Sequence, residues 1–115
     1  MSSRGTTNTE DRGSLSFVRV ASVSEVPAGG ILGVDVNGTK VLLSNIDGEI
    51  HAVSGICTHE YYELDKGFVM ESAVVCALHL SQFDLRTGEV YNPPAVDPLR
   101  VFNVKIEGDS IFVEV

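Results

Sequence analysis

The chain has 115 residues, enough for one domain, and 43% of them are hydrophobic, which allows a small buried core. Sixteen acidic residues stand against eight basic ones, for a formal net charge of −8. That charge argues against nucleic acid and against anionic membrane surfaces as partners, because both attract Lys and Arg.

The acidity favours solubility, and it would also steer the protein toward a partner with a positive face. Residues 1–14 are polar, with scattered charge and no apolar segment of the kind that a secretory signal has. We expect a disordered tail at 1–14 and a single domain at 15–115. No apolar run reaches the roughly 18 residues that a membrane span needs. The cytoplasm is therefore the expected location, and cysteines stay reduced there.

Short segments rich in Val, Ile and Leu alternate with turn residues along the domain. Asn37-Gly38 and Asp47-Gly48 are strong hairpin signals, and Glu107-Gly108-Asp109 predicts a third hairpin. No segment keeps a helical apolar period, so little helix is expected. The pattern predicts an all-β fold, a small antiparallel sandwich or barrel. Its expected strands are Ser16–Val23, Ile31–Val36, Thr39–Ile46, Glu49–Val53, Leu99–Ile106 and Ser110–Val115.

The pattern changes between about residues 54 and 98. Strands become shorter there, and the stretch contains both cysteines and two of the three histidines. We expect an inserted subdomain of loops and short strands that carries the chemistry on the β scaffold.

Two short motifs lie in this stretch, Cys57-Thr58-His59 and Cys76-Ala77-Leu78-His79, with sixteen residues between His59 and Cys76. Each pairs a thiolate with an imidazole, and both ligand types bind iron or zinc. The alternative is two ordinary buried cysteines and two surface histidines. Since the chain has only two cysteines and each has a histidine two or three positions on, the four residues predict one metal site.

The sequence here resembles the Rieske ferredoxin family, and the likeness covers about residues 17–115. The family pattern is C-x-H, a spacer of similar length, then C-x-x-H, as in this chain. Further matching positions are Leu64, Gly67, Phe83-Asp84, Thr87-Gly88-Glu89, Pro93, Pro94, Pro98-Leu99 and Phe102.

The resemblance implies one Rieske-type [2Fe-2S] cluster, with Cys57 and Cys76 on one iron and His59 and His79 on the other. It also implies a monomeric electron carrier without an enzyme activity of its own. Such a carrier takes electrons from a flavin-dependent reductase and passes them to a terminal oxygenase of aromatic hydrocarbon catabolism.

Tyr62 and Leu78 occupy the positions of two bridging cysteines in the respiratory type of this family. The respiratory type also donates hydrogen bonds from a Ser and a Tyr hydroxyl to the cluster sulfurs. Because fewer such hydrogen bonds leave the reduced cluster less stabilised, a low reduction potential is expected here. Ala77 and Leu80 depart from the family pattern, which has Pro and Gly at these positions. Because Leu adopts a positive φ only at a cost, we expect the second loop to follow a somewhat different path.

The remaining residues near the motifs have ordinary alternatives. His51 is expected to be a strand residue, since it fits neither motif. Tyr61 and Tyr62 either line a docking surface or cover the cluster loop. Pro93 and Pro94 are expected to cover the cluster, or else to form a rigid connection.

Three other functions fit parts of the sequence. The first is a structural Cys2His2 zinc module, which uses the same ligands. The second is the small Rieske-like subunit of another reductase complex, such as an assimilatory nitrite reductase. The third is a thiol switch between Cys57 and Cys76, which we interpret as a product of cluster loss.

Overall fold

The computed structural model describes residues 16–58, 61–78, 80–92 and 97–115, and the expected tail at 1–14 lies outside this part. The described chain forms three antiparallel sheets and two short 3₁₀ helices, η1 (Val23–Glu25) and η2 (Leu64–Lys66), so the all-β prediction is confirmed.

The central sheet has the order β10-β5-β4-β3, with β3 Ile31–Val36, β4 Thr39–Ile46, β5 Glu49–Ser54 and β10 Val101–Phe102. The distal sheet is β11-β12-β2, with β2 Phe17–Ser22, β11 Val104–Glu107 and β12 Ser110–Glu114. The third sheet is β6-β7-β8-β9, with β6 Phe68–Met70, β7 Ala73–Val75, β8 Gln82–Asp84 and β9 Val90–Asn92.

The predicted hairpin turns connect the strands of the central sheet. Asn37 and Gly38 have φ of 51° and 86°, and Asp47 and Gly48 have φ of 53° and 91°. Two consecutive residues with positive φ are what a two-residue hairpin of the primed type requires. These turns fix the register of β4 against both of its neighbours.

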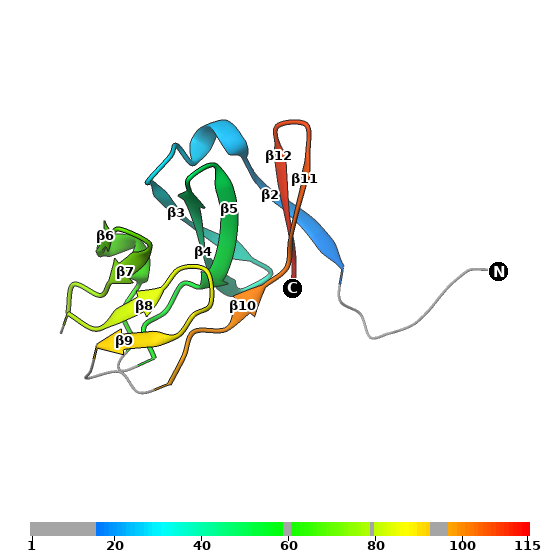
Figure 1. Cartoon of the computed structure of the whole chain (residues 1–115). Coiled ribbons are helices and arrows are strands. Elements are labelled where there is room, and N and C mark those ends of the chain that lie inside the picture. Colours follow the sequence, from blue (N-terminus) through cyan, green and yellow to red (C-terminus); the bar gives the residue numbers. More distant parts are fainter. Residues whose placement is uncertain (1–15, 59–60, 79, 93–96) are drawn as a thin grey trace.

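The central sheet is covered on both faces (Figure 1). Leu42 and Val53 belong to the core shared with the third sheet, whereas Val41 and Leu43 belong to the core shared with the distal sheet. A strand covered on both faces loses the alternation of buried and exposed residues. This explains why β4 is buried throughout from Val41 to Ile46.

The expected strand Leu99–Ile106 is wrong in its extent, because the structure has two strands there. β10 pairs with β5 of the central sheet, whereas β11 pairs with β12 of the distal sheet. The break falls at Asn103, whose carbonyl accepts a 3.0 Å hydrogen bond from the amide of Glu114. The chain changes sheets at this residue, which a pattern of apolar residues alone does not reveal.

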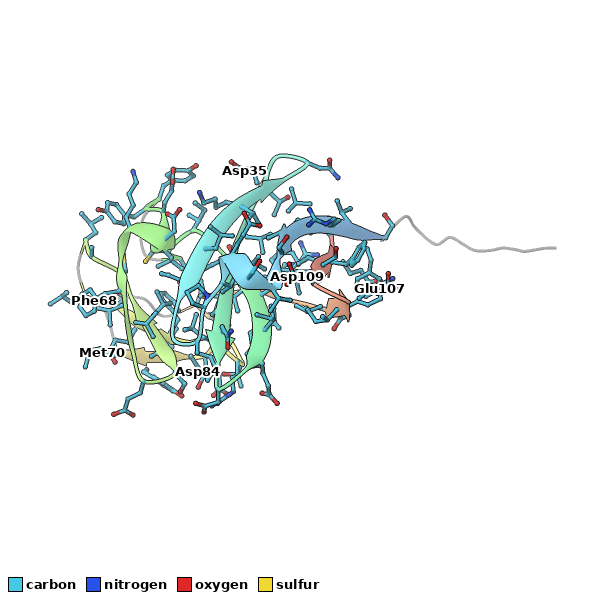
Figure 2. All side chains as sticks on the ribbon, turned by 90° about the horizontal axis from the view of Figure 1, so that it is seen from above. Asp35, Phe68, Met70, Asp84, Glu107 and Asp109 are labelled. Carbon is cyan, nitrogen blue, oxygen red and sulfur yellow. The ribbon has the colours of Figure 1, made fainter. Side chains whose placement is uncertain are left out.

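The third sheet lies within the stretch in which sequence patterning changes. Figure 2 shows Phe68 and Met70 at one end of the molecule and Glu107 of the distal sheet at the other. Strand β7 leads directly into Cys76, and β5 leads toward Cys57. The two sheets thereby position the two motif loops.

Candidate metal centre

The first motif loop leaves the end of β5 and is held by backbone hydrogen bonds. The amide of Cys57 donates to the carbonyl of Tyr62 over 2.9 Å, and Ile56 forms an isolated bridge with Glu63. The hydroxyl of Thr58 donates to the carbonyl of Asp97 over 2.7 Å. The loop is thus fixed on both sides of its cysteine.

The second motif loop is a compact turn after β7. The amide of Cys76 donates to the carbonyl of Ser81, and the amide of Leu80 donates back to the carbonyl of Cys76, each over 2.8 Å. Leu80 has φ of 64° and is exposed. Leu80 thus adopts the positive φ that is costly for Leu, and the two hydrogen bonds close the turn with residue 80 in the left-handed region.

Both cysteines are buried, with 5% of Cys57 and 1% of Cys76 exposed, and neither is in a disulfide. They belong to one hydrophobic core, together with Leu64 and Phe83. The structure therefore places in one core the two cysteines that the sequence assigned to one site. Their predicted partners His59 and His79 lie outside the described residues.

The other residues that the sequence singled out near the motifs differ in where they lie. His51 lies on β5 as predicted, with Nε2 3.4 Å from Oε1 of Glu49. Tyr62 packs against the core that holds both cysteines, whereas Tyr61 is 81% exposed. The two tyrosines thus take different roles, one covering the loop and one projecting from it. Pro93 and Pro94 lie outside the described residues.

Asp84 organises the turn between β8 and β9, a role that sequence patterning did not predict. Its Oδ1 accepts hydrogen bonds from the backbone amides of Arg86 at 2.7 Å and Thr87 at 3.0 Å, and its Oδ2 accepts a hydrogen bond from the side-chain hydroxyl of Tyr91. Burial raises the pKa of Asp84, but these hydrogen bonds outweigh it, with the bond from Tyr91 foremost, and the pKa lies below 3.8. The same bond to Asp84 raises the pKa of Tyr91.

A second group that sequence patterning missed ties the first motif loop to the central sheet. Nζ of Lys40 on β4 lies 3.3 Å from Oε1 of Glu63 and 3.3 Å from Oδ2 of Asp65. Burial alone would lower the pKa of Lys40, but the hydrogen bonds to Glu63 and Asp65 raise it above 10.5. The signal available in the sequence was an isolated Lys on a strand, which is ordinarily a surface residue.

The donor set fits an iron–sulfur group on the evidence of the described residues. Two cysteines from separate loops meet in one apolar core without forming a disulfide. Thiolates are the ligands by which proteins hold iron–sulfur clusters, and apolar surroundings limit solvent access to such clusters. No helix in the described part of the chain is long and apolar enough to cross a membrane.

The comparison with protein families agrees with this arrangement. A family model described as Rieske [2Fe-2S] domain matches residues 16–103, which include both motif loops. The chain belongs to this family of iron–sulfur proteins, and the cofactor is accordingly one Rieske-type [2Fe-2S] cluster.

The similar proteins narrow the class further. The chain is 40% identical over 101 residues to the biphenyl dioxygenase ferredoxin subunit of Pseudomonas sp. (strain KKS102), covering 87% of this chain and 93% of that protein. It is 32% identical over 100 residues to the biphenyl 2,3-dioxygenase ferredoxin component of Rhodococcus jostii (strain RHA1), covering 87% and 94%. Among solved structures, the ferredoxin of carbazole 1,9a-dioxygenase from Nocardioides aromaticivorans IC177 matches with a TM-score of 0.81 and 34% identity, over 85% of this chain and 96% of that one. These relatives are ferredoxin components of multicomponent dioxygenases.

Proposed function

We propose that this chain is the one-electron carrier of a ring-hydroxylating dioxygenase system. The observation that carries the proposal is the meeting of Cys57 and Cys76, from two loops, in one buried core. The relatives that are 30% or more identical and match over nearly their full length are ferredoxin components of such systems. The alignment with the Pseudomonas ferredoxin subunit covers 87% of this chain and 93% of that protein.

In this proposal, Cys57 and Cys76 hold one iron, and His59 and His79 hold the other, within a cluster-binding subdomain at about 54–98. When bound, the cluster accepts and releases one electron. The motif loops exclude water from the thiolates, because both cysteines are buried in the core that also contains Leu64 and Phe83. Holding the ligands in place limits the rearrangement that accompanies a change of charge.

The surface around the two loops supports transfer to another protein. Tyr61, Leu78 and Leu80 are exposed apolar side chains in or beside the motifs. Exposed apolar residues next to a buried redox site suit a contact that excludes water between donor and acceptor. The proposed partners are a flavin-dependent reductase as donor and a terminal ring-hydroxylating oxygenase as acceptor, with the carrier acting as a cytoplasmic monomer.

The potential is proposed to be low. Tyr62 and Leu78 provide no disulfide between the loops, and Tyr62 packs into the core instead. Two neutral imidazoles still place the potential above that of a cluster with four thiolates, because they add no negative charge.

The test is reduction of purified protein by one electron per chain, followed by oxidation on mixing with a terminal oxygenase. We expect a reddish-brown protein with iron, acid-labile sulfide and a paramagnetic signal only in the reduced form. A colourless protein loaded with zinc would instead support the structural zinc module. Transfer to a nitrite reductase and not to any dioxygenase would favour the reductase subunit.

A further inference from the structure

Lys40, Glu63 and Asp65 form an ion group that has no role in the proposed function. Lys40 lies on the scaffold strand β4, and the two carboxylates flank Leu64 at the start of η2, in the chain segment between the two motifs. The Lys40 side chain is only 17% exposed, against 37% for Glu63 and 28% for Asp65. Ion pairs that are shielded to this degree are screened less than pairs on an open surface.

The backbone around Lys40 is fitted to the first motif loop. The carbonyl of Lys40 accepts the amide of Gly55 over 2.9 Å, and the carbonyl of Gly55 accepts the amide of Leu64 over 2.8 Å. A Cβ at Gly55 would lie 2.6 Å from Cγ of Lys40, so only glycine allows the Lys40 stem to lie there. The loop that contains Cys57 is therefore closed against the Lys40 side chain.

The carboxylate of Asp65 has equally little space. A Cβ at Gly33 of β3 would lie 2.4 Å from Oδ2 of Asp65. The other oxygen of Asp65, Oδ1, is buried and has no hydrogen-bond partner within the described part of the chain. A carboxylate with one unsatisfied buried oxygen depends on its cation for its place in the fold.

The same segment also reaches the second motif. At the end of η2, a Cβ at Gly67 would lie 2.0 Å from the carbonyl oxygen of Val75, the residue immediately before Cys76. Displacement of η2 thus moves the backbone that leads into the second loop. Because Leu64 of η2 also packs in the core of both cysteines, one segment connects the two loops.

We propose that Lys40 is a positioning residue for the metal centre, which holds the segment Glu63–Asp65 against the scaffold and so fixes the spacing of Cys57 and Cys76. The proposal rests on the proposed function, since it assumes that these cysteines hold the cluster. Lys40 acts through the loop and does not touch the reacting atoms. Lys40 attaches the loop segment to the scaffold, whereas the hydrogen bonds described above hold each loop in its own conformation.

The test compares Lys40→Met with Lys105→Met as the matched control. Lys105 is on β11 of the distal sheet, where it pairs with Glu107 at 3.5 Å and packs on the rings of Phe17 and Phe112. We expect visible absorbance to bleach about tenfold faster in Lys40→Met than in the wild type when an iron chelator is added. Lys105→Met is expected to bleach at the wild-type rate. Equal bleaching of the two Met variants overturns the proposal.

Two further measurements separate positioning from a general loss of stability. Lys40→Met is expected to alter the paramagnetic signal of the reduced protein and to shift its midpoint potential, because the segment Glu63–Asp65 loses its anchor and the spacing of the two cysteines changes. Lys40→Arg retains the charge, and we expect its bleaching rate to fall within about twofold of the wild type. If Lys40→Met assembles no cluster, Asp65→Asn provides the graded test, and bleaching at the wild-type rate in that variant overturns the proposal.

The two proposals fail in distinguishable ways. Wild-type protein without iron or acid-labile sulfide would remove the proposed function and this inference with it. Wild-type protein with a normal cluster, together with unchanged bleaching in Lys40→Met, would remove the inference alone.

Discussion

The amide of Leu80 donates to the carbonyl of Cys76 over 2.8 Å while Leu80 holds a left-handed backbone with φ of 64°. The bond closes the second motif loop over four residues, with His79 in between. The other non-glycine residues with positive φ in the described chain are Asn37, Asp47 and Glu71. Leu80 is the apolar member of this group, and a left-handed Leu costs about 1 kcal/mol relative to glycine.

Leu80→Gly is therefore expected to raise the free energy of unfolding by about 1 kcal/mol, because glycine adopts this conformation without the Cβ clash. Leu80 is exposed, so little packing is lost with its side chain. Denaturant unfolding of cluster-loaded protein checks the value.

Leu80→Ala serves as the control for this prediction. It removes the same exposed surface but keeps the Cβ, so we expect no gain in stability from it. Glu71→Gly, at φ of 56° in the turn between β6 and β7, should give a gain similar to that of Leu80→Gly. A loss of stability in Leu80→Gly would mean that the Leu80 side chain contributes packing that outweighs the backbone strain.

The strands and turns were largely predictable because local chemistry decides them. Asn37-Gly38 and Asp47-Gly48 select their turns through positive φ, and the apolar runs beside them form the central sheet. The break at Asn103 was not predictable, because it depends on which sheet each half of the segment joins. Alternation in sequence identifies a strand but not its neighbour.

In the candidate site, too, local features can be predicted from the sequence, whereas contacts between distant parts of the chain cannot. Cys57 and Cys76 are predicted as ligands from their spacing to histidines, a local property of the chain, and the structure places both in one buried core. Lys40 was not predictable, because its role comes from a contact 23 residues along the chain with Glu63. At Leu80 the sequence indicates a cost for a positive φ, and the hydrogen bonds of the closed turn hold the residue there in spite of that cost.

Asp84→Asn is expected to lower stability by about 2 kcal/mol at neutral pH, since a buried carboxylate that accepts several hydrogen bonds is lost. Because the pKa of Asp84 in the folded protein lies below 3.8, its contribution is present above pH 3.8. As pH falls below 3.8 and through the folded pKa, Asp84 takes up a proton and the contribution is lost. Acid titration of stability should thus show the wild type and Asp84→Asn converging.

Tyr91→Phe separates the hydrogen bond from the charge in this network. The variant keeps the carboxylate and both backbone donors but loses the hydroxyl that donates to Oδ2 of Asp84. We expect a loss of about 1 kcal/mol and an upward shift in the pKa of Asp84, read from carboxyl NMR shifts. An unchanged Asp84 pKa in Tyr91→Phe would contradict the assigned cause.

Lys40 gives the opposite dependence at high pH. Its pKa in the folded protein is raised above 10.5, so its contribution to stability is fully present below pH 10.5. As pH rises through the folded pKa, the ammonium loses its proton and the attraction to Glu63 and Asp65 disappears. We expect Lys40→Arg to retain stability at a pH where the wild type loses it, because Arg stays charged. Parallel alkaline titrations of the two proteins measure this, and superimposable curves would rule out the ion group as the cause.

The cluster ligands are tested by Cys57→Ser and Cys76→Ser, each expected to abolish iron and sulfide binding, because a Ser hydroxyl does not ionise at neutral pH as a coordinated thiol does. His51→Gln is the matched control, since His51 is the third histidine, lies on β5 and belongs to neither motif. It should retain the full cluster content.

His59→Cys and His79→Cys are expected to lower the midpoint potential wherever the cluster survives, because a thiolate adds a negative charge to the iron it binds. Redox titration of each variant measures this directly, and a potential equal to that of the wild type would remove that histidine from the ligand set.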